Sequence, residues 1–143
     1  MPAIRNISVG LPVKEGHVLV LSGRDAHKGL DFHRAIGGGI EFGERAADAL
    51  RREFLEELGV IVDDCALLGV LENIFTYEGE LGHEIAHVYA VTSAEIDAIP
   101  LDAELYVLDE GSPVRWVSVD IIRSGSRPLF PEGAAEALLT LIN

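Results

Sequence analysis

The sequence predicts an α/β fold in which helices cover both faces of a mixed β-sheet. Three observations lead to this expectation. Short apolar segments typical of strands alternate with polar, glycine-containing turns along most of the chain. Residues 45–58 instead repeat their apolar side chains at spacings of three and four, as an amphipathic helix does. A second helix is expected at the C-terminus, and strands mixed with helices are typical of layered α/β proteins.

The first third of the chain is expected to form strands that lead into a glycine-rich segment. Residues 4–13 and 17–21 have the roughly alternating apolar pattern of strands, and the Lys-Glu-Gly turn between them favours a hairpin. A polar loop is expected over 22–31. Residues 32–36 then lead into three consecutive glycines, 37–39, where the backbone can approach a ligand closely.

The remainder of the chain is expected to contain two helices and four strands. The helix over 45–58 is predicted to end at Gly59, a common C-terminal stop. Its apolar stripe consists of Ala46, Ala49, Leu50, Phe54 and Leu58. Strands are expected at 66–71, 74–77, 85–91 and 114–117, mostly loop over 93–113, and the C-terminal helix over 131–142.

Net charge and hydropathy limit the classes of function. The 143 residues include 24 acidic and 11 basic side chains, a formal net charge of −13, yet 48% of them are hydrophobic. A chain this apolar can bury a core, which excludes intrinsic disorder. Its acidity argues against a protein that binds nucleic acid or membrane surfaces through clustered cations. No Lys or Arg occurs between Arg52 and Arg115, a stretch with 15 acidic residues, which either form a solvated face or bind a cation.

Cysteine content and segment composition predict a cytoplasmic protein of one domain. Cys65 is the only cysteine, so an intramolecular disulfide and a thiolate zinc site are both excluded. Residues 1–5 lack the features of a secretory signal, and no segment approaches the roughly 20 apolar residues of a membrane span. Because no repeat or linker interrupts the pattern, residues 1–143 are expected to form a single domain.

Three glutamates project from one side of the predicted helix. Glu53, Glu56 and Glu57 have i, i+3 and i+4 spacing, and like charges at this spacing repel one another. Arg52 relieves this repulsion only in part. Oxygen ligands with few cations nearby suit a hard divalent ion, Mg²⁺ or Mn²⁺. The spacing by itself leaves a metal site and a solvated face equally open.

The glycine-rich segment and this helix together resemble the Nudix box. The family pattern is Gly, five residues, Glu, seven residues, Arg-Glu, an apolar residue, any residue, Glu-Glu, any residue, Gly and an apolar residue. The matching residues are Gly38, Glu44, Arg52, Glu53, Phe54, Glu56, Glu57, Gly59 and Val60. Two positions depart mildly from the family, which usually has an aliphatic residue in place of Phe54 and often a proline in place of Ile36.

This resemblance implies a Nudix-type α/β/α sandwich and a pyrophosphohydrolase that acts on acid anhydrides. The substrate would be a small nucleotide-type molecule, a nucleoside diphosphate linked to another group, cleaved by water attack on phosphorus with Mg²⁺ or Mn²⁺. The metal ligands implied by the resemblance are Glu53, Glu56, Glu57 and a backbone carbonyl at Gly37 or Gly38. Glu44 would support the metal site, and Arg52 would orient the glutamates by ion pairing. A homodimer is compatible with the family, although no residue requires it.

The general base has several candidates. Glu53 comes first and Glu84 second, with Glu104 or Glu110 third. For Glu84, an exposed carboxylate on an edge strand is an equally good interpretation.

Phosphate groups also need hydrogen-bond donors, which carboxylates cannot provide. Arg24, Lys28 and Arg34 lie in or beside the loop before the box and are the candidates. Arg34 is favoured because it lies on the expected strand that leads into the glycines. Four aromatic residues, Phe32, Phe75, Tyr77 and Tyr89, could stack on a nucleobase, although aromatic residues on strands more commonly belong to the core.

Two rival functions fit part of the sequence. A Nudix-fold binding or regulatory module without turnover would keep the fold, but such modules usually lose box glutamates, and all four remain. An acidic structural domain with a merely solvated helix predicts no stabilisation by metal ions. No residue pattern selects among nucleoside triphosphates, ADP-ribose, dinucleoside polyphosphates and nucleotide sugars as substrates.

Overall fold

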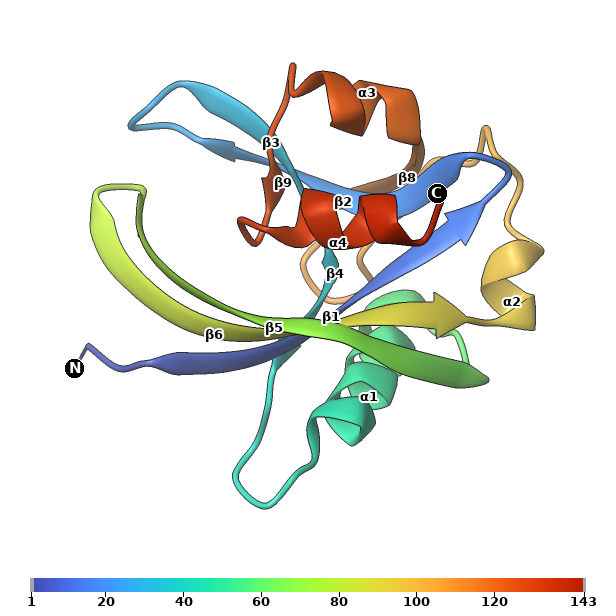
Figure 1. The fold of residues 1–143 in the computed structure, drawn as a ribbon, viewed down its shortest axis with the longest axis horizontal. Helices are drawn as coiled ribbons and strands as arrows, with labels where there is room; N and C mark the ends of the chain where they lie inside the picture. The colour runs from blue at the N-terminus through green and yellow to red at the C-terminus, as the bar shows by residue number, and fades with distance from the viewer. Residues whose placement is uncertain (1, 143) are drawn as a thin grey trace.

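Strand β1 (Arg5–Lys14) joins the two halves of the sheet. In the computed structural model, which describes residues 2–142, β1 runs parallel to β6 (Glu80–Thr92) and antiparallel to β4 (Ile36–Gly39). Its last two residues pair with the start of β2 (His17–Asp25). β1 therefore brings the glycine-rich strand and β6 to a common place in the fold (Figure 1).

Each half of the sheet contains further paired strands. β5 (Asp64–Tyr77) and β6 form a long antiparallel hairpin with one irregularity between Leu67 and Gly69. On the other side, β2 pairs with β3 (Leu30–Arg34) and with β8 (Pro113–Ser118). The remaining elements are α1 (Ala46–Leu58), α2 (Ala94–Asp97), β7 (Leu105–Tyr106), α3 (Val119–Ser124), β9 (Leu129–Phe130) and α4 (Ala134–Thr140).

Apolar clusters lie on both faces of the sheet. Ile7 and Val9 on β1 pack in a cluster with Ile122 of α3 and Leu138 of α4. The second cluster contains Leu50 and Phe54 of α1 together with buried side chains of β2, β4 and β8. Helices thus cover both faces, with α1 on one side and α3 and α4 on the other (Figure 1), and the predicted α/β/α sandwich is confirmed.

Helix α1 lies very close to β1. A Cβ atom on Gly10 would lie 2.9 Å from the ring of Phe54, so the glycine leaves room for this ring against the strand. The hydroxyl of Ser8 donates a 2.7 Å hydrogen bond to the carbonyl of Ala46 at the start of the helix. Phe54, the aromatic residue at a usually aliphatic position of the box, is therefore buried against β1.

Three expected element boundaries were wrong. The polar loop over 22–31 is mostly strand, because β2 continues to Asp25 and β3 begins at Leu30. Residues 66–71 and 74–77 belong to one strand, β5, whose polar residues lie on exposed positions of an edge. The C-terminal helix begins at Ala134, three residues beyond Pro131, with Gly133 at its N-cap. Among residues 2–142, none of the helices is both long enough and apolar enough to cross a membrane.

Candidate active site

Helix α1 presents its polar side to the end of β4. The helix ends at Gly59, whose left-handed φ of 68° and N–H bond to the Leu55 carbonyl close the last turn. Because Leu50 and Phe54 are buried toward the sheet, Arg52, Glu53 and Glu57 occupy the side next to the glycines.

Arg52 is the centre of a hydrogen-bond network that links the helix to the preceding loop. Its Nε and Nη2 donate to the two carboxylate oxygens of Glu44 at 2.8 and 2.9 Å. Nη2 also donates to the Gly39 carbonyl at 2.9 Å, and Nη1 donates to Glu53 Oε1 at 3.0 Å. Hydrogen bonds from Arg52 lower the pKa of Glu44 to about 2. The fork geometry of arginine thus fixes two carboxylates against one loop.

Glu53 and Glu57 form a close carboxylate pair beside Gly38. A Cβ atom on Gly38 would lie 2.6 Å from the Glu53 carboxyl carbon. Any residue other than glycine at this position would therefore displace the Glu53 side chain. Glu57 Oε2 is buried and has no hydrogen-bond partner. Burial, together with the charges of Glu53 and Asp109, raises the pKa of Glu57 to about 8. Such a pair favours either a shared proton or a bound cation.

Glu56 lies outside the lining of the cavity that Glu53 and Glu57 face, but next to Glu53. Its side chain is 54% exposed, and Arg52 Nη1, which donates to Glu53 Oε1 at 3.0 Å, also contacts Glu56 Oε2 at 3.3 Å. Among residues 2–142, no three Asp, Glu, His or Cys side chains meet in a preformed metal-binding group. Of the three glutamates expected together, the structure brings two into one cavity.

This cavity, the carboxylate cavity, has a volume of about 370 Å³. Its charged lining residues are Arg5, Arg34, Glu53, Glu57, Asp109 and Glu110. The backbone N–H of Leu108 donates to the Glu57 carbonyl at 2.9 Å and so attaches the acidic segment to α1. Asp109 and Glu110 are exposed, as expected for acids of a solvated surface, and they line this cavity beside Glu57. Glu104, the other candidate from this segment, lines neither cavity described here.

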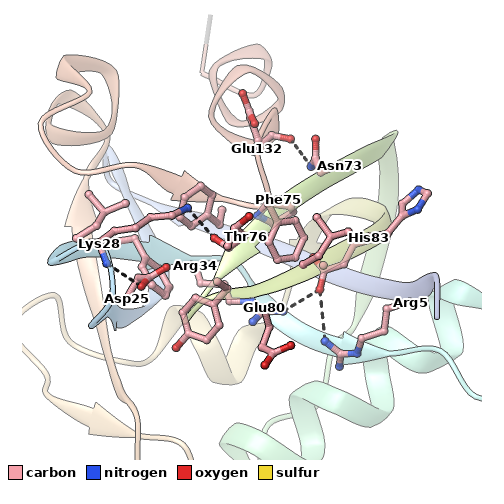
Figure 2. Close-up of a pocket in the computed structure, with 18 of the residues that line it drawn as sticks. Arg5, Asp25, Lys28, Arg34, Asn73, Phe75, Thr76, Glu80, His83 and Glu132 are labelled. Atoms are coloured by element: carbon pink, nitrogen blue, oxygen red, sulfur yellow. Dashed lines mark hydrogen bonds and ion pairs between the residues drawn. The ribbon is translucent and has the colours of Figure 1, made fainter. Parts of the chain in front are cut away.

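A second, larger cavity, whose lining Figure 2 shows, shares Arg5 and Arg34 with the first. This aromatic cavity has a volume of about 650 Å³, and Phe32, Phe75, Tyr77 and Phe130 form its aromatic wall. Arg5 and Arg34 line both cavities and therefore stand at their junction. Arg5 was missed in the sequence because it lies far from the box and reaches the site only through the pairing of β1 with β6.

Glu84 lies between these two arginines. Its Oε2 is 3.4 Å from Arg5 Nη1 and 3.9 Å from Arg34 Nη2, and its side chain is 12% exposed. Parallel pairing sets Arg5 directly opposite Glu84. Glu84 is therefore a partly buried ion-pair partner rather than an exposed carboxylate at a strand edge.

The other two cations predicted to bind phosphate have protein partners. Arg24 forms an exposed ion pair with Asp31 at 2.9 Å and lies outside the lining of both cavities. Lys28 lines the aromatic cavity, where its Nζ donates to the Thr76 carbonyl at 2.6 Å. Of the three predicted cations, only Arg34 reaches the carboxylate cavity.

A sequence profile of the NUDIX domain matches residues 4–140. The chain belongs to the Nudix hydrolase family. It is 34% identical over 85 residues to the nucleoside triphosphatase NudI of Salmonella arizonae, an alignment that covers 57% of each chain. The aligned part thus spans little more than half the length of this curated relative.

Solved Nudix structures share the fold over nearly the whole chain. The MutT NUDIX hydrolase from Burkholderia pseudomallei superimposes with a TM-score of 0.67 at 23% identity and covers 99% of both chains. An ADP compounds hydrolase superimposes with a TM-score of 0.63 at 18% identity, covering 99% of this chain and 72% of the other. At these identities the likeness establishes the fold.

Proposed function

We propose that the protein hydrolyses a pyrophosphate bond in a nucleoside diphosphate linked to another group, with the help of Mg²⁺ or Mn²⁺. The observation that carries this proposal is the Glu53–Glu57 pair, which faces a cavity that also contains Arg5 and Arg34. Carboxylates on one wall and guanidinium groups on another match a substrate whose phosphates bridge a cation and protein donors.

The residues of the carboxylate cavity fit a divalent cation. Glu57 Oε2 is a buried oxygen without a hydrogen-bond partner, and the lack of a side chain at Gly38 lets the Glu53 carboxylate lie against the glycine backbone. Glu53, Glu57 and the backbone carbonyl of Gly38 would hold the ion, with Glu56 as a further oxygen ligand. A bound divalent ion lowers the pKa of water and neutralises phosphate charge.

The protein groups have separate tasks in this proposal. Arg34 and Arg5 bind the phosphates and hold the scissile bond beside the carboxylates. Glu53 accepts a proton from the attacking water. The water oxygen forms a bond to phosphorus, and the bond between phosphorus and the oxygen of the leaving phosphate group breaks. Arg52, held by Glu44, fixes the rotamer of Glu53 before substrate binds.

A release assay tests the proposed function. Nucleoside triphosphates, ADP-ribose, nucleotide sugars and dinucleoside polyphosphates are incubated with Mg²⁺ or Mn²⁺ over a neutral to alkaline pH range. We expect turnover of at least one class, abolished by EDTA and strongly reduced in Glu53→Gln. The exposed Glu136 on α4 provides the matched control, Glu136→Gln, which should retain activity. Failure to hydrolyse any of these compounds would favour a Nudix-fold binding module instead.

A further inference from the structure

The aromatic cavity lies between two hairpins that no strand pairing joins directly. Within residues 2–142, the β2–β3 and β5–β6 hairpins are connected through β1, which pairs with β6 along most of its length but with β2 only at its last two residues. Most of the side chains that line the cavity come from these two hairpins. The separation of the hairpins therefore sets the width of the cavity.

The turns at the ends of the two hairpins, 26–29 and 78–79, are hydrogen-bonded to each other. Asp25 Oδ2 accepts a hydrogen bond from the N–H of Glu78 at 3.2 Å, and the Glu78 carboxylate accepts one from the N–H of Ala26. Lys28 Nζ donates to the Thr76 carbonyl at 2.6 Å (Figure 2). We call these three hydrogen bonds the turn–turn contact.

Asp25 bonds to both turns from a buried position. The residue is 3% exposed, and its Oδ1 accepts from the N–H of Lys28 in its own turn at 3.1 Å, while Oδ2 accepts from Glu78 in the other. Burial raises the pKa of Asp25, but hydrogen bonds from the N–H groups of Lys28, Glu78 and His27 outweigh it and lower the pKa below its usual value. The ionised carboxylate thus offers one acceptor oxygen to each turn, whereas an asparagine has a single acceptor oxygen.

Two rings from opposite hairpins meet next to the turn–turn contact. Phe32 of β3 packs edge-on against Tyr77 of β5, with ring centroids 6.0 Å apart. The hydroxyl of Tyr77 donates to the Arg24 carbonyl at 3.4 Å. Because Tyr77 directly precedes Glu78, the position of this ring depends on the same contact, and both rings line the cavity.

We propose that Asp25 is a positioning residue that keeps the turn–turn contact closed and thereby fixes the width of the aromatic cavity. Asp25 lies outside the lining of the carboxylate cavity, and none of the three hydrogen bonds involves α1, which carries the box glutamates. Opening the contact should therefore weaken substrate binding and leave the chemical step intact. This consequence rests on the proposed function, because it concerns a substrate whose phosphates lie at Arg5 and Arg34.

Hydrogen exchange without ligand tests the turn–turn contact. The full-length wild type, Asp25→Asn and Asp31→Asn are compared by exchange mass spectrometry in EDTA. Asp31→Asn is the matched control, because Asp31 lies on the same hairpin in an exposed ion pair and lines neither cavity. In Asp25→Asn, the peptides that contain the two turns should both exchange about tenfold faster, since one turn has lost its acceptor and the other its partner. Exchange in α1 should stay unchanged, and the control should match the wild type.

A second pair of variants changes the contact from the less buried side. Glu78→Ala removes the acceptor of the Ala26 N–H and should accelerate exchange in both turns, whereas Glu78→Gln keeps an acceptor oxygen and should behave like the wild type. The NOE between the rings of Phe32 and Tyr77 reports the width of the cavity. It should weaken in Asp25→Asn and Glu78→Ala and persist in Glu78→Gln. Thermal unfolding verifies that each variant is folded.

Steady-state kinetics on the substrate found in the release assay give the functional readout. Asp25→Asn and Glu78→Ala should raise KM about tenfold and keep kcat within about twofold of the wild type, because only binding depends on the contact. Glu78→Gln and Asp31→Asn should have wild-type constants.

The outcomes separate this inference from the proposed function. Faster exchange in only one turn or in neither overturns the inference, as does an unchanged NOE between the two rings. An unchanged KM, or a loss confined to kcat, in a variant whose turns have opened overturns it as well. If the wild type hydrolyses none of the compounds, the proposed hydrolysis is rejected, and the exchange and NOE results decide the inference by themselves.

Discussion

Glu53 and Glu84 are two partly buried carboxylates with different surroundings. Glu53 lies beside Glu57 and the glycines, whereas Glu84 is placed between two arginines at the junction of the cavities. Glu84 lines the aromatic cavity and not the carboxylate cavity, whereas Glu53 lines the carboxylate cavity where the proposed cation and attacking water would lie. Glu84 therefore suits a positioning role, and Glu53 suits the role of base.

These roles predict different kinetics at saturating metal. Glu53→Gln should lower kcat about 10²- to 10⁴-fold, the range typical of a lost general base. Glu84→Gln should mainly raise KM, because the arginines lose their partner while the base remains. Steady-state kinetics on the substrate found in the release assay provide both constants. If Glu53→Gln keeps a near wild-type kcat, its assignment as base is wrong.

Glu57 makes the stability of the metal-free protein depend on pH. Its pKa is raised to about 8 in the fold, so the folded state keeps a proton that an unfolded chain releases near the ordinary value of 4.5. The unfolded state binds fewer protons between these two values, and stability must therefore fall as pH rises through this range.

Replacement by the neutral isostere should remove this dependence. Urea unfolding in EDTA, measured at several pH values between about 5 and 9, should show a steeper loss of stability for the wild type than for Glu57→Gln. At the alkaline end the variant should be the more stable of the two. Parallel curves for the two proteins would contradict the assignment of this proton to Glu57.

At the scale of elements, α1 and the loop after β4 are held together by one side chain. Arg52 bonds simultaneously to Glu44, Glu53 and the Gly39 carbonyl. Lysine retains the charge but lacks the planar fork that reaches these acceptors together. Arg52→Lys should therefore lower metal affinity or kcat about 10- to 100-fold, the usual effect of losing a residue that orients metal ligands. Arg51→Lys, on the exposed neighbouring position of the same helix, should behave like the wild type in titration calorimetry and kinetics.

Elements formed by interactions between residues close in the sequence were predicted well, and elements that depend on contacts between distant residues were not. The helix containing the box was predicted to within one residue of its start, because its apolar stripe and Gly59 are local features. The end of β2 was wrong because Ser22 and Gly23 are weak strand formers by themselves. Gly23 belongs in the strand because the Phe32 ring covers it, a contact that only the folded hairpin supplies.

The same distinction holds for the candidate site. The box residues lie within one short segment, so Glu44, Arg52, Glu53 and Glu57 could be nominated from their resemblance to the family pattern. Arg5 and Asp109 reach the cavities through the β1–β6 pairing and through the segment joined to α1 at Leu108. Neither contact leaves a pattern in the neighbouring sequence.

At the scale of the whole molecule, the net charge of −13 means that cations also stabilise the fold by screening repulsion among the acidic side chains. Binding of a cation at one site must be distinguished from this screening. Mg²⁺ or Mn²⁺ at a hundred times its Kd should stabilise the fold by about 2.7 kcal/mol and raise Tm. Glu53→Gln and Glu56→Gln should lose most of this gain, whereas Glu136→Gln, which makes the same change in net charge elsewhere, should keep it. Equal gains in all four proteins, measured by calorimetry at constant ionic strength, would indicate screening alone.

The placement of the first strand has a practical consequence for all these experiments. Ala3 and Arg5 line the aromatic cavity, so a purification tag fused ahead of Pro2 would lie within a few residues of this lining. Such a tag would obstruct binding of the compounds being tested and lower their measured affinity. Recombinant protein for binding work should therefore have its leader cleaved off close to Pro2, or be tagged only after Asn143.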